Sequence, residues 1–162
     1  MASDSRALDP QAVAARSQSS YPEPYRARVL PREVRALGDA LGLTRIGVNL
    51  VRIFPGKASS MRHWHTHEDE FVYVLEGELV LRTDAGEQIL CAGMCAGMCA
   101  GFPASERDGH HLLNKSATPA AFLVVSNRDA EDSAHYSEPD VDLMWSPPAA
   151  RGRMTRRDGT PC

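Results

Sequence analysis

Apolar residues in the middle of the chain recur with a period of two, which is typical of β-strands. Ile46, Val48 and Leu50 alternate with smaller or polar residues, and this run from residue 44 to residue 54 ends at Pro55-Gly56. Further apolar runs occupy residues 71–75, 79–81, 88–90 and 121–126. Thr83 to Gly86 joins two of these runs and predicts a hairpin turn. Short strands separated by turns, with little helix between them, predict an all-β sandwich or barrel.

The segments on either side of this strand-rich region have weaker patterns. Residues 1–20 are small and polar and predict a flexible N-terminal segment. Residues 21–43 form an N-terminal arm, in which Pro31 to Leu41 predicts one short helix because its apolar residues fall at helical spacing. Residues 44–128 are expected to form the barrel, and residues 129–162 a polar C-terminal extension.

Length and charge exclude several classes of function. The chain has 162 residues, which suits one domain, and a net charge of −3 that provides no basic field for nucleic acid or anionic membranes. No apolar run approaches the roughly 20 residues of a membrane helix, and the first 20 residues lack the apolar core of a signal peptide. We therefore expect a cytoplasmic protein whose partner is a small molecule.

A short Cys-Ala-Gly-Met repeat begins at Cys91, recurs at Cys95 and starts again at Cys99. Cysteines four residues apart would line one face of a helix and could form a thiolate metal site. However, a glycine in every repeat disfavours a helix by about 1 kcal/mol each, and no second pair of ligands with zinc-like spacing is present. We interpret the repeat as a tandem duplication that lengthens a loop.

Five of the six histidines lie in two clusters: His63, His65 and His67, followed by His110 and His111. Residues two apart on a strand share a face, so the imidazoles of His63 and His65 can lie side by side. Glu70 could return to the same place on the next strand, and His110 could arrive from a distant one. Three imidazoles and one carboxylate suit a first-row divalent metal. Surface or core histidines are the alternative, and spacing alone does not decide between them.

Two motifs here resemble those of the cupin superfamily. Gly56, His63-Trp-His65, Glu70 and Gly77 resemble the first cupin motif, with four residues between His65 and Glu70 and six between Glu70 and Gly77. His110 and Asn114 match the end of the second motif, with Pro103 upstream. The stretch 62–78 is similar to a subgroup of small bacterial cupins labelled sugar-phosphate-isomerase-like or regulator-like, and the resemblance extends over about residues 21–161.

The resemblance implies a double-stranded β-helix, the jelly-roll barrel of cupins, with a metal ion inside. The ligands carried over are His63, His65, Glu70 and His110, and the metal is a divalent Fe, Mn, Ni or Zn ion. His67 is the less favoured ligand and is expected at the mouth of the barrel. This sequence departs from the pattern in having Ser105 where the second motif usually has glycine, and in the residues that the repeat adds.

Three functions are compatible with such a site. The first is a metal-dependent enzyme that acts on a small polar substrate, for example by isomerising or epimerising a sugar or sugar phosphate. The alternatives are a non-catalytic barrel that binds or senses a small ligand, and an iron-dependent dioxygenase. The length of the two arms leads us to expect a homodimer. Candidate cations for a phosphate are Arg45, Lys57 and Arg62, and candidate general bases are Tyr73, Glu76 and His67.

Overall fold

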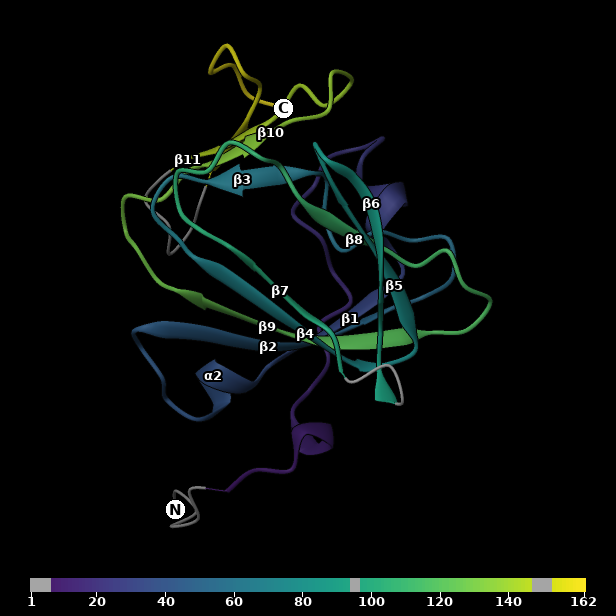
Figure 1. Ribbon diagram of the computed structural model, residues 1–162. Coiled ribbons are helices and arrows are strands. Elements are labelled where there is room, and N and C mark those ends of the chain that lie inside the picture. The colour runs from purple at the N-terminus through teal and green to yellow at the C-terminus, as the bar shows by residue number, and fades with distance from the viewer. Residues whose placement is uncertain (1–6, 94–96, 147–152) are drawn as a thin grey trace.

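A computed structural model describes residues 7–93, 97–146 and 153–162, and most of its regular structure is β-strand (Figure 1). The helices are short: η1 (Pro10–Ala12), α1 (Arg26–Val29) and α2 (Leu37–Ala40). The strands are β1 (Arg32–Ala36), β2 (Ile46–Ile53), β3 (His63–His65), β4 (Glu70–Glu76), β5 (Glu78–Thr83), β6 (Gly86–Cys91), β7 (Cys99–Phe102), β8 (His111–Leu113), β9 (Ala120–Asn127), β10 (Ala134–Tyr136), β11 (Met144–Ser146) and β12 (Arg153–Thr155). The all-β class and the main strands predicted from the alternating pattern are confirmed.

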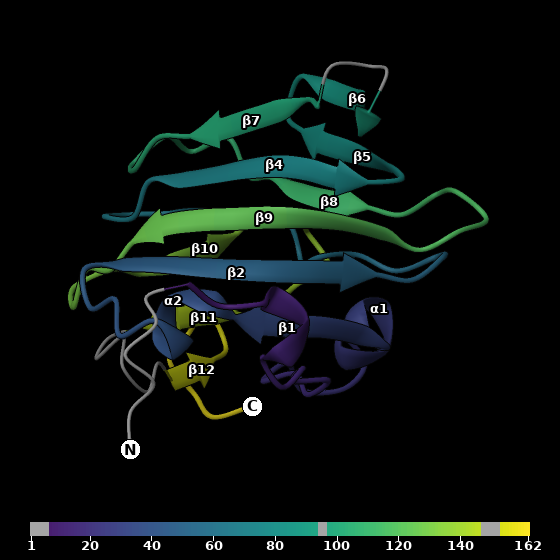
Figure 2. The same ribbon diagram turned by 90° about the horizontal axis from the view of Figure 1, so that it is seen from below.

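Three antiparallel sheets surround the interior. The largest has the order β1-β2-β9-β4-β7, and the smaller two have the orders β12-β11-β10-β3 and β6-β5-β8. Figure 2 looks onto the large sheet, with β8, β10 and β11 behind it. A bridge between His63 of β3 and His110, directly before β8, joins the two smaller sheets, and a bridge between Ala58 and Leu113 pairs the segment before β3 with β8. The smaller sheets therefore form one wall opposite the large sheet, as the jelly-roll prediction requires.

An apolar core fills part of the space between these walls. On β4, Val72 and Val74 are buried while Phe71 and Tyr73 are exposed, which is the period of two expected for a strand with one inward face. Burying each such aliphatic side chain contributes about 1.5–3 kcal/mol. The core comprises Val51, Ile53, Val72, Val74, Leu79, Leu81, Leu90, Leu112, Ala120 and Phe122.

The helix predicted over Pro31 to Leu41 is wrong for most of its length. Residues Arg32–Ala36 form β1, which pairs with β2 in a register that runs from Arg32 opposite Ile53 to Ala36 opposite Asn49. Only Leu37–Ala40 are helical. The ladder of backbone hydrogen bonds to β2 outweighs the weak helical spacing, since helix propensity differs among ordinary residues by only about 0.7 kcal/mol.

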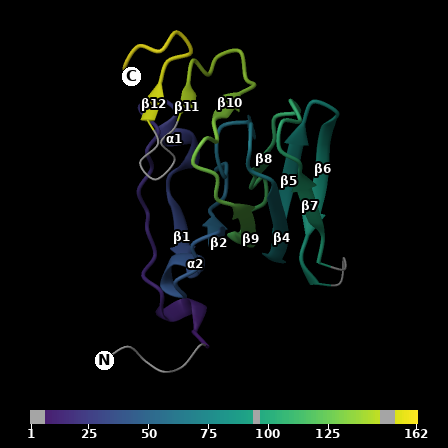
Figure 3. The same cartoon turned by 90° about the vertical axis from the view of Figure 1, so that its left-hand side faces the viewer.

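The N-terminal arm packs against the C-terminal extension of its own chain. Tyr21 and Val29 share a buried cluster with Tyr136, Val141 and Leu143, and Figure 3 shows α1 at the same end of the molecule as β11 and β12. Residues 1–6, part of the segment predicted to be flexible, lie outside the described residues. Within residues 7–20, Arg16 forms a backbone bridge with Val34 of β1. The domain boundaries and the homodimer stay predictions.

The Cys-Ala-Gly-Met repeat connects β6 to β7. Cys91 is the last residue of β6 and Cys99 is the first residue of β7, while Cys95 lies outside the described residues. The two described cysteines thus belong to strands and do not lie on one face of a helix. No helix among the described residues is long and apolar enough to span a membrane.

Candidate metal centre

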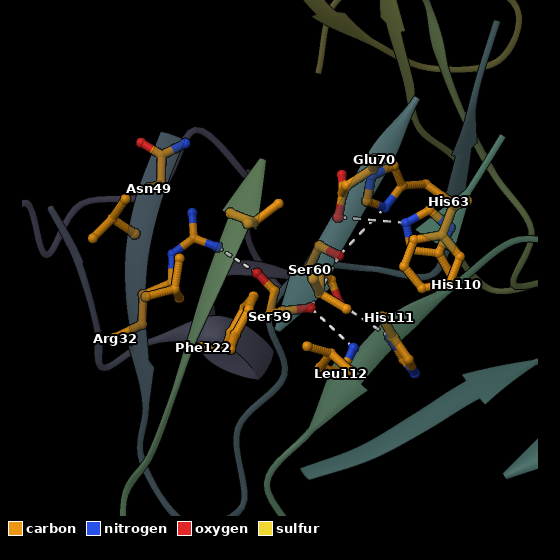
Figure 4. A pocket seen from close by; sticks show the side chains of 15 residues that line it. Arg32, Asn49, Ser59, Ser60, His63, Glu70, His110, His111, Leu112 and Phe122 are labelled. Atoms are coloured by element: carbon orange, nitrogen blue, oxygen red, sulfur yellow. Dashed lines mark hydrogen bonds and ion pairs between the residues drawn. The ribbon is translucent and has the colours of Figure 1, made fainter. Parts of the chain in front are cut away.

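The four side chains predicted as ligands converge inside the barrel. The Nε2 atoms of His63 and His65 are 3.0 Å apart. The Glu70 carboxylate lies 3.8 Å from Nε2 of His65 and 3.6 Å from Nε2 of His110. Figure 4 shows His63, Glu70 and His110 directed toward one another. Neighbouring ligands that each lie about 2.1 Å from a metal are roughly 3 Å apart, so a small contraction would give this set metal-ligand spacing.

Backbone pairing brings the two histidine motifs together. His63 and His65 lie on the same face of β3, whereas Trp64 lies on the other face and stacks on His135 at 4.4 Å. His110 directly precedes β8, and its backbone exchanges two hydrogen bonds with His63, at 2.9 and 3.2 Å. The segments around residues 63 and 110 are therefore held in register by backbone hydrogen bonds alone.

Hydrogen bonds orient two of the imidazoles. Nδ1 of His63 donates to the carbonyl oxygen of Met61 at 2.8 Å. Nδ1 of His65 donates to Oδ2 of Asp132 at 2.6 Å. A ring that donates through Nδ1 presents the lone pair of Nε2, and in both rings this atom faces the cluster.

The ring of His110 provides the clearest sign that a ligand belongs here. His110 is only 4% exposed, and both of its ring nitrogens are buried without a hydrogen-bond partner among the described residues. The distance of 3.6 Å between Nε2 of His110 and Oε1 of Glu70 is too long for a hydrogen bond. Leaving a buried polar atom unsatisfied costs about 1–3 kcal/mol, and coordination to a metal would remove that penalty. Phe102 stacks on the ring with 3.5 Å between centroids, which restricts its orientation.

The charges of His63 and Glu70 suit a divalent cation. Burial, together with repulsion from the neighbouring His65 and His110, lowers the pKa of His63 to about 3, so this imidazole is neutral at physiological pH. Burial alone would raise the pKa of Glu70, but His110, His63 and His65 lower it below its ordinary value, so Glu70 is a carboxylate. Neutral imidazole and carboxylate are the protonation states that bind metals.

Sequence reasoning missed Asp132, which supports the cluster from the C-terminal extension. Its buried carboxylate accepts hydrogen bonds from His65 and from the backbone N–H groups of His67 (2.8 Å) and Glu68 (3.2 Å). Burial opposes ionisation of Asp132, but these donors bring its pKa down to about 2. Asp132 lies 67 residues beyond His65, in a polar segment without a motif, so no local pattern identified it.

Two cavities adjoin the cluster. One, of about 220 Å³, is lined by His63, Glu70 and His110 on one side and by Arg32 and Asn49 on the other (Figure 4). The other, of about 340 Å³, is lined by His65 and a set of acidic and polar residues: Glu68, Thr83, Gln88, Glu106 and Asp108. Phe102 and His110 line both cavities. A small molecule in the first cavity would lie next to His63, Glu70 and His110.

The structure does not bring the predicted general bases to the cluster. Tyr73 is exposed on the outer face of β4, since its position has the opposite parity to Glu70. Glu76 follows a register shift in β4 and forms an ion pair with Arg52 at 2.7 Å. His67 is exposed and its ring contacts Thr66. None of these three candidates lines either cavity.

The predicted phosphate-binding cations also lie elsewhere. Arg45 is exposed before β2. Lys57 donates to the carbonyl oxygen of Ala27 at 2.9 Å, and Arg62 forms an ion pair with Asp84. None of the three lines either cavity. The cation that does so is Arg32, which belongs to the segment predicted as helix.

Two motif positions have structural roles. Asn114 is fully buried, and its amide donates to the carbonyl oxygens of Ile53 (2.9 Å) and Thr118 (2.8 Å), so it stabilises the barrel. Ser105, at the usual glycine position, has a φ of 67°, a left-handed conformation that glycine adopts without cost. Its hydroxyl donates to the carbonyl oxygen of Thr66 at 2.8 Å, which offsets part of that cost.

This fold and motif geometry agree with known proteins. Residues 49–126 match the Cupin domain family. A crystal structure of a sugar phosphate isomerase of the cupin superfamily, from Silicibacter pomeroyi, shares 44% identity with the chain over 96% of each protein, with a TM-score of 0.87. The chain belongs to the cupin superfamily.

Two further structures are similar to this cupin. A protein from Acidithiobacillus ferrooxidans, provisionally named a sugar phosphate isomerase, is 27% identical over 81% of this chain and 80% of its own, with a TM-score of 0.68. A polyketide cyclase from Streptomyces resistomycificus is 20% identical over 76% of this chain and 79% of its own, with a TM-score of 0.61, and shows the shared fold alone. No curated protein matches the chain.

Proposed function

We propose that this cupin binds one divalent first-row metal ion through His63, His65, Glu70 and His110. The observation that carries the proposal is the pair of buried, unpartnered ring nitrogens of His110 beside two oriented imidazoles and an ionised carboxylate. Iron, manganese, nickel and zinc all accept such a mixed nitrogen and oxygen ligand set. The Asp132 carboxylate fixes the ring of His65 and increases its basicity, as partners of metal-bound histidines generally do.

We further propose that the protein is an isomerase or epimerase of a small polar substrate such as a sugar or sugar phosphate. Its support is the similarity to the Silicibacter pomeroyi protein over 96% of both chains, together with a cavity that borders the ligand cluster. A bound metal would supply Lewis acidity for a carbonyl or hydroxyl oxygen. The barrel walls would shield the substrate from bulk water, while Asp132 and Phe102 hold His65 and His110 in place.

An exchange experiment tests the enzymatic proposal even when the substrate and product are unidentified. Metal-loaded protein is incubated in D₂O with a panel of aldoses, ketoses and their phosphates, and carbon-bound hydrogen is followed by NMR. We expect conversion or exchange with at least one member of the panel. It should be lost in Glu70→Gln and retained in His67→Ala, because His67 is exposed and does not line either cavity.

Other outcomes would favour the two alternative functions. Binding of a sugar without conversion or exchange would contradict the isomerase and leave a small-ligand-binding barrel. Dioxygen consumption by the iron-loaded protein would indicate an oxygenase.

A homodimer remains our expectation. Gel filtration of the 17.7 kDa chain at about twice that mass would support it, and elution as a monomer would contradict it.

A further inference from the structure

Arg32 extends from β1 into the cavity that borders the metal-ligand cluster. Figure 4 shows its side chain on the side of the pocket away from His63, Glu70 and His110, with one hydrogen bond to the carbonyl oxygen of Ser59. That carbonyl is neutral, so it positions the guanidinium without compensating its charge. The guanidinium and the ligand cluster thus face the same cavity from opposite sides.

Arg32 forms no ion pair with a carboxylate in the described part of the chain. Its Nε atom is buried and lacks a hydrogen-bond partner there. The nearby ionisable group is the Tyr21 hydroxyl, and burial raises the pKa of Tyr21, so this hydroxyl is neutral. Burial lowers the pKa of Arg32, but from an ordinary value so high that the guanidinium stays protonated.

The other half-buried arginines among the described residues illustrate the contrast. Arg35, Arg52 and Arg62 each form an ion pair with a carboxylate. A partly buried charge without a partner is costly, because desolvation is not repaid by any attraction. The cost at Arg32 is explained if an anion occupies the cavity.

We propose that Arg32 is the binding residue for an anionic group, a phosphate or a carboxylate, on the small molecule that this cavity takes. The planar guanidinium can donate two parallel hydrogen bonds to either group. Asn49 and Ser60 provide neutral polar groups that can bond to hydroxyl groups of that molecule. The apolar walls of the cavity are formed by Val34, Val51 and Phe122, and this combination is typical of small-molecule sites.

This inference deepens the proposed function and rests on it in one respect. If the cluster binds a metal, a molecule anchored at Arg32 by its anionic end would present its other end to that metal. The binding of the anion to Arg32 does not itself require the metal, so the two proposals can fail separately.

The test uses three small probes that differ in one group: glycerol 3-phosphate, glycerate and uncharged glycerol. Each is titrated calorimetrically into the full-length protein as purified and after treatment with a chelator, with the metal content recorded in both states. We expect at least one of the two anions to bind at least tenfold more tightly than glycerol in both states. The stronger of the two identifies the anion as phosphate or carboxylate.

Matched variants assign the binding to Arg32. Arg32→Gln should weaken anion binding at least tenfold without changing the metal content. Arg35→Gln makes the same charge change on the same strand, but Arg35 does not line this cavity. The Arg35→Gln protein should therefore bind the anions as the wild type does. Arg32→Lys keeps the positive charge but cannot donate two parallel hydrogen bonds, so its affinity for the anions should be intermediate. This variant replaces Arg32→Gln in the test if Arg32→Gln does not fold.

Two results would overturn the inference: anions that bind no more tightly than glycerol, or an Arg32→Gln protein that is folded and binds them as the wild type does. Loss of metal binding with retained anion binding would contradict the proposed function alone.

Discussion

Two groups of potential metal ligands lie next to each other in this barrel and differ in one respect. His63, Glu70 and His110 form one, and His65, Glu68 and Asp132 form the other, and within each the ligand atoms lie within 4.8 Å of one another. In the second group, Asp132 accepts hydrogen bonds from His65 and from two backbone N–H groups, and Glu68 accepts one from the backbone of Asp129. In the first group, His110 has no hydrogen-bond partner in the described residues.

The difference shows that the number of histidines and carboxylates does not identify a metal site. In the second group, hydrogen bonds satisfy the carboxylates of Asp132 and Glu68 without an ion, and Asp132 positions His65, whose Nε2 lies 3.0 Å from Nε2 of His63 in the first group. Buried nitrogens without partners are rare in folded proteins, and in the first group they lie beside a second imidazole and a carboxylate, which favours this group as the place for an ion. The predictions below contrast the two groups and the residues that support them.

The largest effect is expected when the carboxylate of Glu70 is replaced, in comparison with replacement of the Glu68 carboxylate. Glu70→Gln removes the only carboxylate of the first group and should weaken metal binding at least about 100-fold, since a neutral amide replaces an anionic ligand. Glu68→Gln changes the second group in the same way and should leave the affinity within about threefold. Competition with a chromophoric chelator measures both constants. Equal losses in the two variants would show that the second group also binds the ion.

The next effect concerns Asp132. Asp132→Asn weakens the hydrogen bond to His65, and loss of such a partner typically costs about 10–100-fold in metal affinity. The substitution also weakens the hydrogen bonds that this side chain accepts from two backbone N–H groups. We therefore expect the free energy of unfolding of the metal-free protein to fall by about 1–3 kcal/mol. Asp129→Asn is the control, because Asp129 contacts neither His65 nor the cluster. Unchanged metal affinity in Asp132→Asn would contradict the positioning role.

A smaller effect is expected where Phe102 stacks on His110. Phe102→Leu keeps an apolar side chain but removes the stacking, which should cost about 0.5–1.5 kcal/mol of stability in chemical denaturation. Metal content should be retained, since Phe102 is not a ligand. Tyr73→Leu removes an exposed aromatic ring on the outer face and should change stability by less than about 0.5 kcal/mol. A larger loss for Tyr73→Leu than for Phe102→Leu would contradict this assignment of inner and outer faces.

The smallest effect is expected at Ser105. Ser105→Gly relieves a left-handed backbone but loses the hydrogen bond to Thr66, two contributions of about 1 kcal/mol each that nearly cancel. Ser105→Ala keeps the backbone cost and loses the hydrogen bond, so it should be less stable than Ser105→Gly by about 1 kcal/mol. Thermal unfolding of the two variants gives the comparison, and the reverse order would refute this account of the motif position.

Local patterns were sufficient to predict much of the barrel and the shared face of His63 and His65. The full set of four ligand candidates, which includes the distant His110, was instead implied by the resemblance to the cupin motifs. The alternation along β2, β4 and β9 is set by one buried face, and the spacing of His63, His65 and Glu70 is set by strand parity across one turn. Such features depend on neighbouring residues, so they can be read from the sequence.

The remaining features depend on partners that are distant in sequence. Arg32 faces the cavity because β1 adds to the edge of the large sheet, and its own residues favour a helix by spacing. Asp132 reaches His65 from the C-terminal extension. Tyr73 was a plausible base by type, but its strand parity directs it outward. In each case a tertiary contact decides the role of the residue, and composition does not encode it.

The most direct test of the metal centre is elemental analysis of untagged protein, comparing the wild type with His65→Ala, His110→Ala and His67→Ala. We predict about one equivalent of iron, manganese, nickel or zinc in the wild type and in His67→Ala, and loss of the metal in His65→Ala and His110→Ala. A folded wild-type protein that contains no metal and gains none on titration would contradict the account.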